Sequence, residues 1–517
     1  MRPSLRTLVA ILGLTLGLLA PAVALSPSQK AVVLSGGYAP AVYTDFTAIN
    51  STLPSSLYTY SGPSLRTIID ATGVITYAPN NLLTYSNTFS NAAWSASHAT
   101  VTSNTSDVTD PLGGNSANKI VTANAADNFV GQISATGYTI VGRTFMFSFW
   151  ARTLSGTAVV PIIGDDVAGK FWSNPSVNTV SVTAAWQHFA VYGVAPSGSI
   201  GSGPRVGFGG YSTWETAQTI YVYGATLSVV TYETTPRPGD QVITTSAAYY
   251  GPAFDYDPTA LAPRGLRVEE ARTNLYLNSG APATQTIAVV NGSAYSISFY
   301  GTGVLTLSGA LTQVMTGSAY PARTTYTGTT STTSLVVTVT TLGAMSYPQV
   351  ELGAFPTSAI PSGASAVTRA ADVVGIVGPA LGVLQGASWS AVVESSGVNA
   401  SVAMLIGGQG PLNYYAYISS NVVSAYNGTT GFTDGTVTPT NTNRVAVTAS
   451  KTQIQLASNG TSPSNYSATF PSSSSRYLGT QGSADFIGGY IRKLALYNSV
   501  LHAPVLQRNT LLGTPLH

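Results

Sequence analysis

Few side chains in this sequence are placed to do covalent chemistry. The chain has no cysteine, which excludes disulfides, thiolate zinc sites and cysteine nucleophiles. No serine lies in a G-x-S-x-G elbow. No histidine belongs to an H-x-x-x-H or H-E-x-x-H pattern, so a metalloprotease-type zinc site is not expected; the four histidines are His98, His188, His502 and His517.

The carboxylates are also too scattered to indicate a hydrolase. Glycosidases use two facing carboxylates, one of them protonated, but the sequence holds only six glutamates. Glu269 and Glu270 are adjacent, so on a strand they point to opposite faces. We expect them to serve in a turn or in ion pairs with Arg267 or Arg272 in preference to acting as catalysts. Two aspartates from different strands could still act together, and a glycan-hydrolysing enzyme therefore remains an alternative.

Aromatic residues are the remaining candidates for function. Sugar binding needs flat aromatic faces next to amide or carboxylate groups, and two groups of residues in the sequence offer them. The first is Trp172, Tyr211, Trp214 and Glu215; the second is Tyr414, Tyr415 and Tyr417. Core packing is the alternative for Trp172 and Trp214. The other four tryptophans are expected in cores: Trp94, Trp150, Trp186 and Trp389.

The composition indicates an all-β protein of several domains. The 517 residues exceed one typical domain several-fold. Only 8% are charged, whereas Gly, Tyr, Ser and Thr are abundant. Thr, Val and Tyr suit pleated strands, and Gly, Ser, Asn and Pro suit turns. The net charge is +2 and no basic stripe is visible, so nucleic-acid binding is not expected.

Short alternating segments predict sandwiches with turns about every ten residues. The segments 144–150 (TFMFSFW) and 293–300 (SAYSISFY) are similar strands. Each follows a related opening, NLLTYS at 81–86 and NLYLNS at 274–279, which predicts two homologous sandwiches over about 81–235 and 274–365. A third unit with a different pattern continues to the C-terminus and ends in a short helix at about 502–511.

The N-terminus has the sequence pattern of a secretory signal peptide. Arg2 and Arg6 precede an apolar run at 8–20, and small residues follow at 22–24. An apolar segment that anchors the chain in an assembly is the alternative.

The motifs FDYDP at 254–258 and RGLRVEEARTNL at 264–275 resemble a segment found in phage and prophage virion proteins. The stretches at 81–94, 110–115, 147–152 and 348–372 resemble a carbohydrate-binding-module-like jelly roll. The C-terminal unit is similar to the concanavalin A/laminin-G-like fold through Asn459-Gly460 and the strand at 489–498. The resemblance implies an all-β chain of β-sandwich and jelly-roll modules with a C-terminal concanavalin A-like sandwich.

The resemblance also divides the chain. A strand such as 66–75 normally runs directly into FDYDP, but here about 175 residues intervene. We therefore predict that the jelly roll is inserted into a split β-element, and that strand 66–76 lies beside residues 251–270. The predicted units are a signal-like or anchoring segment 1–25, an N-terminal β-element 26–80, the inserted jelly roll 81–235, a β connector 236–273, a smaller sandwich 274–370 and a concanavalin A/laminin-G-like domain 371–517.

Jelly rolls of this kind often hold a structural Ca²⁺ on oxygen ligands, and the candidate ligands are Asp107, Asp110, Asp165 and Asp166; a solvated turn is the alternative for the last two.

The leading functional expectation is a non-enzymatic phage appendage on the virion that binds cell-surface glycans, contacts other virion proteins and forms homo-oligomers. A secreted bacterial adhesin or lectin-like protein is the second hypothesis, and the hydrolase is the third.

Overall fold

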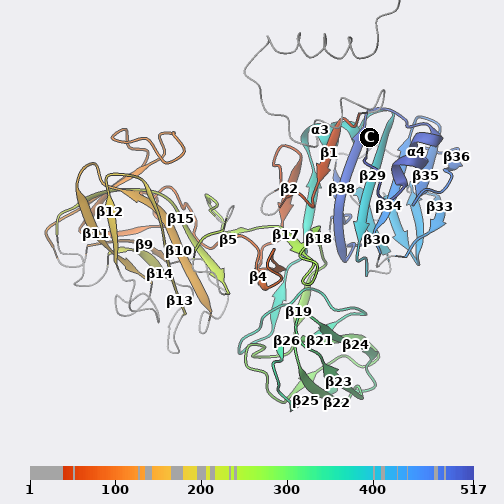
Figure 1. Ribbon diagram of the computed structural model, residues 1–517, viewed down its shortest axis with the longest axis horizontal. Coiled ribbons are helices and arrows are strands. Elements are labelled where there is room, and N and C mark those ends of the chain that lie inside the picture. Colours follow the sequence, from red (N-terminus) through yellow and green to blue (C-terminus); the bar gives the residue numbers. More distant parts are fainter. Residues whose placement is uncertain are drawn as a thin grey trace, which may run out of the picture.

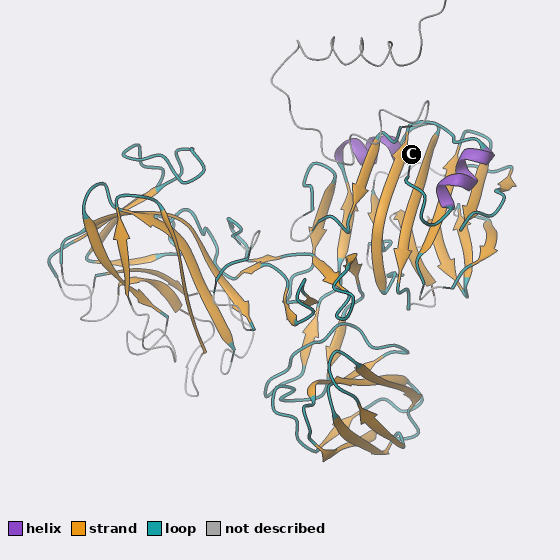
Figure 2. Ribbon diagram, viewed as in Figure 1, coloured by secondary structure: helices purple, strands orange, loops and turns teal. Residues whose placement is uncertain are grey.

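The computed structural model shows an all-β protein, as the composition predicts. Strands dominate it, and the three sets of paired sheets appear as three sandwiches (Figures 1 and 2). No helix among its described residues is long and apolar enough to cross a membrane. The structure describes residues 39–49, 53–125, 128–133, 143–164, 179–194, 205–209, 216–231, 235–237, 241–399, 402–408, 414–427, 429–438, 441–470, 475–482 and 485–516. The signal-like segment lies outside these residues.

The first sandwich packs two antiparallel five-stranded sheets, in the orders β13-β10-β15-β8-β7 and β12-β11-β14-β9-β6. The strand β10 supplies its core with Phe145, Phe147 and Phe149, all fully buried. Its strands are β6 (Ser95–Ser97), β7 (Ala99–Thr102), β8 (Asn118–Thr122), β9 (Phe129–Ile133), β10 (Thr144–Arg152), β11 (Thr157–Ile163), β12 (Thr179–Thr183), β13 (Gln187–Val194), β14 (Arg205–Gly209) and β15 (Thr219–Val230).

The second sandwich is smaller, with a four-stranded sheet β20-β25-β22-β23 and a three-stranded sheet β24-β21-β26. Ile297 and Phe299 of β21 lie in its core, as the alternation in 293–300 predicts. Its strands are β20 (Gln285–Ala288), β21 (Ala294–Tyr300), β22 (Gly303–Gly309), β23 (Gln313–Gly317), β24 (Arg323–Thr329), β25 (Ser334–Thr341) and β26 (Ser346–Leu352).

The two sandwiches share an internal hydrogen-bond scheme at their openings. Asn81 and Asn274 are both fully buried, and each amide donates two hydrogen bonds and accepts two. In both cases one accepted bond comes from the backbone NH two residues later. Equivalent side chains with equivalent partners in both sandwiches support the internal repeat seen in the sequence.

A second pair of contacts repeats in the same way. Gln132 bonds both the NH and the carbonyl of Thr84, at 2.8 Å each. Gln285 does the same to Leu277, which lies three residues after Asn274 as Thr84 lies three after Asn81. The glutamine in each case ties the opening segment to a neighbouring strand.

The third sandwich has an eight-stranded sheet, β17-β18-β38-β29-β34-β35-β36 with β1 also on β38, and a seven-stranded sheet, β2-β28-β37-β30-β31-β32-β33. The short helices α3 (Gly378–Leu384) and α4 (Ala503–Thr510) pack beside it, and α4 agrees with the predicted C-terminal helix. Its strands are β1 (Val42–Asp45), β2 (Tyr58–Ser61), β17 (Ala253–Tyr256), β18 (Pro263–Val268), β28 (Val373–Ile376), β29 (Trp389–Ser396), β30 (Val402–Gly408), β31 (Tyr414–Ser419), β32 (Val422–Tyr426), β33 (Gly431–Thr436), β34 (Asn443–Ala449), β35 (Ile454–Ser458), β36 (Ser464–Tyr466), β37 (Arg476–Leu478) and β38 (Gly489–Tyr497).

Strands from the N-terminal part therefore complete this sandwich. β1 pairs with β38 and β2 pairs with β28. The predicted division set residues 26–80 apart from 371–517, because local patterns do not show which distant strand is the partner. β17 and β18 add to the same sheet through β38.

Three segments link the sandwiches and are here called the junction: residues 62–78, 251–274 and 356–372 (Figure 1). The second of them includes β17 and β18, which also belong to the eight-stranded sheet. It contains the hairpin β3 (Thr67–Ile69) with β4 (Ile75–Tyr77), and the pair β19 (Arg272–Asn274) with β27 (Val367–Arg369). β5 (Asn80–Asn81) pairs with β16 (Tyr249–Tyr250) where the chain enters and leaves the first sandwich. The backbone NH of Ile69 donates to Asp255 at 2.9 Å, so strand 66–76 lies beside the 251–270 segment, as expected for an insertion.

Candidate functional site

All four predicted sugar-binding residues of the first sandwich lie outside the described residues. These are Trp172, Tyr211, Trp214 and Glu215, together with the calcium candidates Asp165 and Asp166. The binding roles of these residues stay predictions.

The tyrosines predicted in the last domain lie on β31. Tyr417 is half-buried, and its burial raises the pKa of its phenol. The side chains of Tyr414 and Tyr415 lie outside the described part of the chain. The backbone thus places all three on one strand of the seven-stranded sheet.

The two described calcium candidates are engaged in bonds to the protein. Asp107 accepts from Lys119 Nζ at 2.7 Å and from the Tyr221 hydroxyl at 2.9 Å. Asp110 accepts four hydrogen bonds from its own loop, two of them from Ser116. Among the described residues, no group of three or more His, Asp or Glu side chains is arranged to hold a metal ion.

An aromatic surface that the sequence reading missed lies on the outer face of the first sandwich. Trp150 and Trp186 were expected in the core, and for Trp150 this expectation is wrong, because it is partly exposed on the outer face. Trp186 is also partly exposed, but it packs against a small buried cluster of Val108, Ala117 and Tyr221. Trp94 and Trp389 are buried as predicted. The partly exposed or exposed residues of this face form what we call the aromatic platform: Trp150, Arg152, Trp186, His188 and Tyr192.

Strand alternation explains why Trp150 faces outward. Phe145, Phe147 and Phe149 occupy the core-facing positions of β10, so its even-numbered neighbours face away from the core. β13 follows the same rule, because Phe189 and Val191 pack on the core and leave His188 and Tyr192 outside. The run of aromatics in TFMFSFW hides this difference, since both faces of the strand carry large apolar residues.

The platform is held in place by defined contacts. Trp150 pairs across the sheet with His188, and their rings stack at a centroid distance of 4.8 Å and an angle of 12°. The Trp150 indole NH donates to Gln241 Oε1 at 2.7 Å. The guanidinium carbon of Arg152 lies 6.0 Å from the centre of the Trp186 ring, and the Trp186 indole NH donates to the Thr109 carbonyl at 2.9 Å. The surface is therefore preformed.

The chemistry of the platform suits a flat, partly apolar ligand. Its rings offer faces for C–H-rich surfaces, and Arg152 offers guanidinium donors at the edge. The Gln241 amide is engaged within the protein, by the Trp150 indole and the Gly224 carbonyl. Burial lowers the pKa of the His188 imidazole, which favours the neutral ring at pH 7. Along β13, His188 and Tyr192 are four residues apart, a span of about 13 Å.

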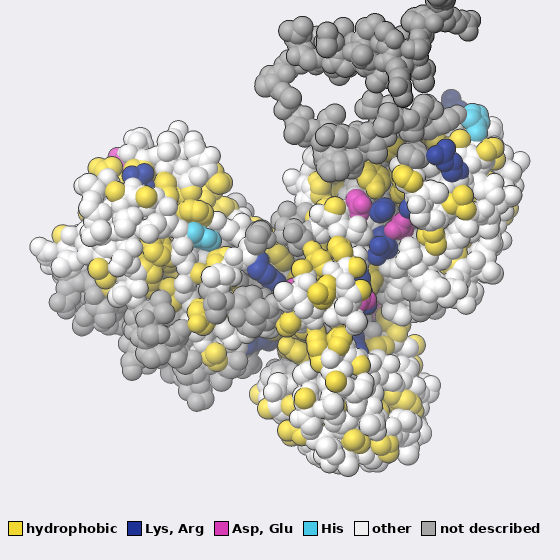
Figure 3. Space-filling view, in the orientation of Figure 1, with side chains coloured by type: hydrophobic (Ala, Val, Ile, Leu, Met, Phe, Trp, Pro, Cys, Tyr) yellow, Lys and Arg dark blue, Asp and Glu magenta, His cyan; other side chains and the backbone are white. Residues whose placement is uncertain are grey.

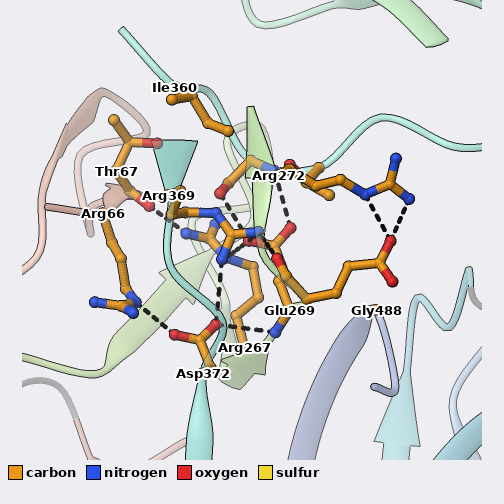
Figure 4. Close-up of polar contacts among 12 residues, drawn as sticks. Arg66, Thr67, Arg267, Glu269, Arg272, Ile360, Arg369, Asp372 and Gly488 are labelled. Carbon is orange, nitrogen blue, oxygen red and sulfur yellow. Dashed lines mark hydrogen bonds and ion pairs between the residues drawn. The ribbon is translucent and has the colours of Figure 1, made fainter. Parts of the chain in front are cut away.

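The second notable cluster is a network of buried charges at the junction (Figure 4). Arg66 pairs with Asp372, and Arg267 pairs with Asp255; all four side chains are at most 8% exposed. Arg267 also lies 3.1 Å from Glu269, and Arg369 lies 3.6 Å from both Glu269 and Asp372. Glu270 pairs with Arg272. The ion-pair reading of the Glu269-Glu270 dipeptide is therefore confirmed.

The charge state of Glu269 follows from these contacts. Burial alone would raise its pKa, but Arg369, Arg267 and the hydrogen bonds from Ser358 outweigh that effect and lower the pKa of Glu269 to about 2. The carboxylate is thus ionised at neutral pH. A residue in this state is unsuited to the proton-donating role of a glycosidase acid.

A cleft of about 460 Å³ opens beside this network. Its walls come from the junction, from the second sandwich (Tyr300 and Arg323) and from the third (Tyr490 and Asn399). Figure 3 shows few charged side chains on the viewed face, and most of those lie on the third sandwich or where the parts meet.

Comparison with known proteins gives partial structural similarities. No protein-family model and no curated protein matches the sequence. The CBM40 of Ruminococcus gnavus IT-sialidase bound to α2,3-sialyllactose matches with 21% identity, over 26% of this chain and 88% of its own, at a TM-score of 0.23. The CBM22-1 xylan-binding domain of Paenibacillus barcinonensis Xyn10C matches with 10% identity, over 38% and 99%, at 0.19.

The enzymatically active domain of bacteriophage CBA120 tailspike protein 4 matches with 19% identity, over 29% of this chain and 21% of its own, at a TM-score of 0.21. These similarities are too partial to decide function.

Proposed function

We propose that this chain is a non-catalytic glycan-binding protein that works as a phage virion appendage for attachment to a cell surface. The aromatic platform on the first sandwich carries the proposal. It is a preformed, partly exposed set of aromatic rings on a rigid sheet, with guanidinium donors at its edge. Binding surfaces of this composition hold sugars by stacking and orient them by hydrogen bonds.

The appendage role is supported by the sequence around residues 254–275, which resembles a segment of phage virion proteins. Such a role also fits the arrangement of three rigid sandwiches on one junction, because an attachment protein needs to hold its binding surfaces in fixed positions. Copies of the chain assembled on a virion would add avidity to a weak single site.

The first test is binding of the full chain to an array of bacterial cell-surface polysaccharides. We expect Trp150→Ala and His188→Ala each to lower the affinity for the bound glycan about tenfold, the loss expected for an aromatic anchor worth about 1.4 kcal/mol. Val159→Ala is the control, because Val159 is exposed on β11 of the opposite sheet. Equal affinity of wild type and both platform variants would overturn the assignment of this surface.

The same glycan then tests the non-catalytic part of the proposal. The protein is incubated with the polysaccharide, and reducing ends are measured over time. We expect no increase above buffer. Release of oligosaccharide by the wild type, lost on substitution of a carboxylate, would establish the hydrolase instead.

A further inference from the structure

The cleft at the junction is separate from the aromatic platform and carries its own charge. Three arginines line it, Arg264, Arg267 and Arg323. Two of them are neutralised within the protein: Arg267 by Asp255 and Glu269, and Arg264 by Asp257 at 2.8 Å. The two carboxylates of the wall, Asp255 and Glu269, are in turn held by arginine.

Arg323 differs from the other two arginines. No carboxylate among the described residues forms an ion pair with it, and its Nη2 donates to the Ser298 hydroxyl at 2.8 Å. Its Nε is buried and donates to no acceptor in the described structure. The guanidinium lies 5.2 Å from the centre of the Tyr300 ring, which fixes its plane. The cleft therefore presents a positioned cation with unused donors.

The rest of the wall offers groups that suit sugar hydroxyls. The Asn399 amide donates to the carbonyls of Gly397 and Gly488, at 3.1 and 3.2 Å, which fixes its orientation and leaves its Oδ1 as an acceptor. The rings of Tyr300 and Tyr490 line opposite sides of the boundary between the second and third sandwiches. The volume of about 460 Å³ is within the range of small-molecule sites.

We infer that this cleft binds a saccharide unit that carries a carboxylate, such as a hexuronic acid residue, with Arg323 as the carboxylate ligand. A guanidinium fork matches a planar carboxylate by two parallel hydrogen bonds. The end of the guanidinium supplies this fork: no hydrogen bond among the described residues engages Nη1, and Nη2 donates one of its two hydrogens to Ser298 and keeps the other. This inference rests on the proposed glycan-binding function and names a ligand class and a second site for it.

The test uses isothermal titration calorimetry of the full chain with oligosaccharides of hexuronic acid, with their methyl esters and with a sulfated neutral oligosaccharide. We expect the acid to bind and the ester to bind at least tenfold more weakly. Arg323→Gln should abolish binding of the acid. Arg323→Lys keeps the charge and the stem over Tyr300, and it should still weaken binding about tenfold because it lacks the fork.

Arg508→Gln is the matched control, since Arg508 lies on α4 away from the cleft, and its affinity should equal that of the wild type. Trp150→Ala should also leave uronate binding intact, so failure of the platform and failure of the cleft are distinguishable. The inference is overturned if no uronate binds, if acid and ester bind equally, if the sulfated sugar binds as well as the acid, or if both Arg323 variants bind like the wild type.

Discussion

Replacing Glu269 by glutamine should weaken the junction by about 3 kcal/mol. The carboxylate of Glu269 is nearly buried, faces Arg267 and Arg369, and accepts two hydrogen bonds from Ser358. Its surroundings lower its pKa from the ordinary 4.5 to about 2. At 1.36 kcal/mol per pH unit this corresponds to about 3 kcal/mol, similar to the 3–5 kcal/mol expected when one partner of a buried ion pair is removed.

The sign of the pH dependence follows from the lowered pKa. A carboxylate whose folded-state pKa lies below its unfolded value contributes its full stabilisation above pH 4.5. That contribution is lost as the pH falls from about 4.5 to about 2. The wild type should therefore loosen at the junction over this acidic range, and Glu269→Gln should lack this component of the pH dependence.

Hydrogen exchange read by mass spectrometry is the appropriate assay, because three sandwiches need not unfold in one step. Peptides from the junction should exchange faster in Glu269→Gln at pH 7, while peptides from the core strand β21 should not change. Glu270→Gln is the matched control, because Glu270 also forms an ion pair, with Arg272, but its side chain is 34% exposed. The expected loss of junction stability is therefore below about 1 kcal/mol. Equal junction protection in both variants would refute the reasoning.

Two further predictions concern the sandwiches themselves. Asn81→Ala and Asn274→Ala should each destabilise their own sandwich by about 2–4 kcal/mol in urea denaturation, since each leaves several buried backbone groups without partners. The exposed Asn465→Ala is the control and should show no such loss. A loss in only one of the two asparagine variants would contradict their equivalence. Phe147→Ala should destabilise the first sandwich by about 3–5 kcal/mol, measured by thermal unfolding. Leu112→Ala is the control, because Leu112 is 81% exposed and its loss should change stability little. A Phe147→Ala effect as small as that of the control would contradict the packed core.

The sequence predicts the local features of this fold well. Alternation identifies β10 and β21, and the paired openings at Asn81 and Asn274 identify the two related sandwiches, because both signals are contained within a few residues. Pairing between strands that are far apart in the sequence is harder to predict. Nothing near Val42–Asp45 shows that β1 belongs beside β38, more than 400 residues away. Register over such distances depends on the assembled core and not on local pattern.

The candidate site shows the same limit. The sequence predicts the ion pairs of Glu269 and Glu270 with arginines, but it places Trp150 and Trp186 in the core. The assignment of aromatics to sugar binding stays a prediction. Large apolar residues on both faces of TFMFSFW hide which face of β10 is buried until the partner strands are known. The register shift between Ser148 and Trp150 in the pairing with β15 leaves the alternation within β10 unchanged.

The buried charges join segments of the junction that are remote in the sequence. Arg66 and Asp372 are 306 residues apart in sequence, yet they meet inside the junction, as do Arg267 and the carbonyl of Thr67, 200 residues apart. An unpaired buried charge costs several kcal/mol, so arrangements that separate these pairs are disfavoured. The junction is therefore specified by charge pairing between segments that are remote in sequence. The same ion pairs engage Asp255 and Glu269, so neither carboxylate neutralises Arg323 in the cleft. The proposed carboxylate ligand and the rigidity of the junction therefore depend on one set of contacts.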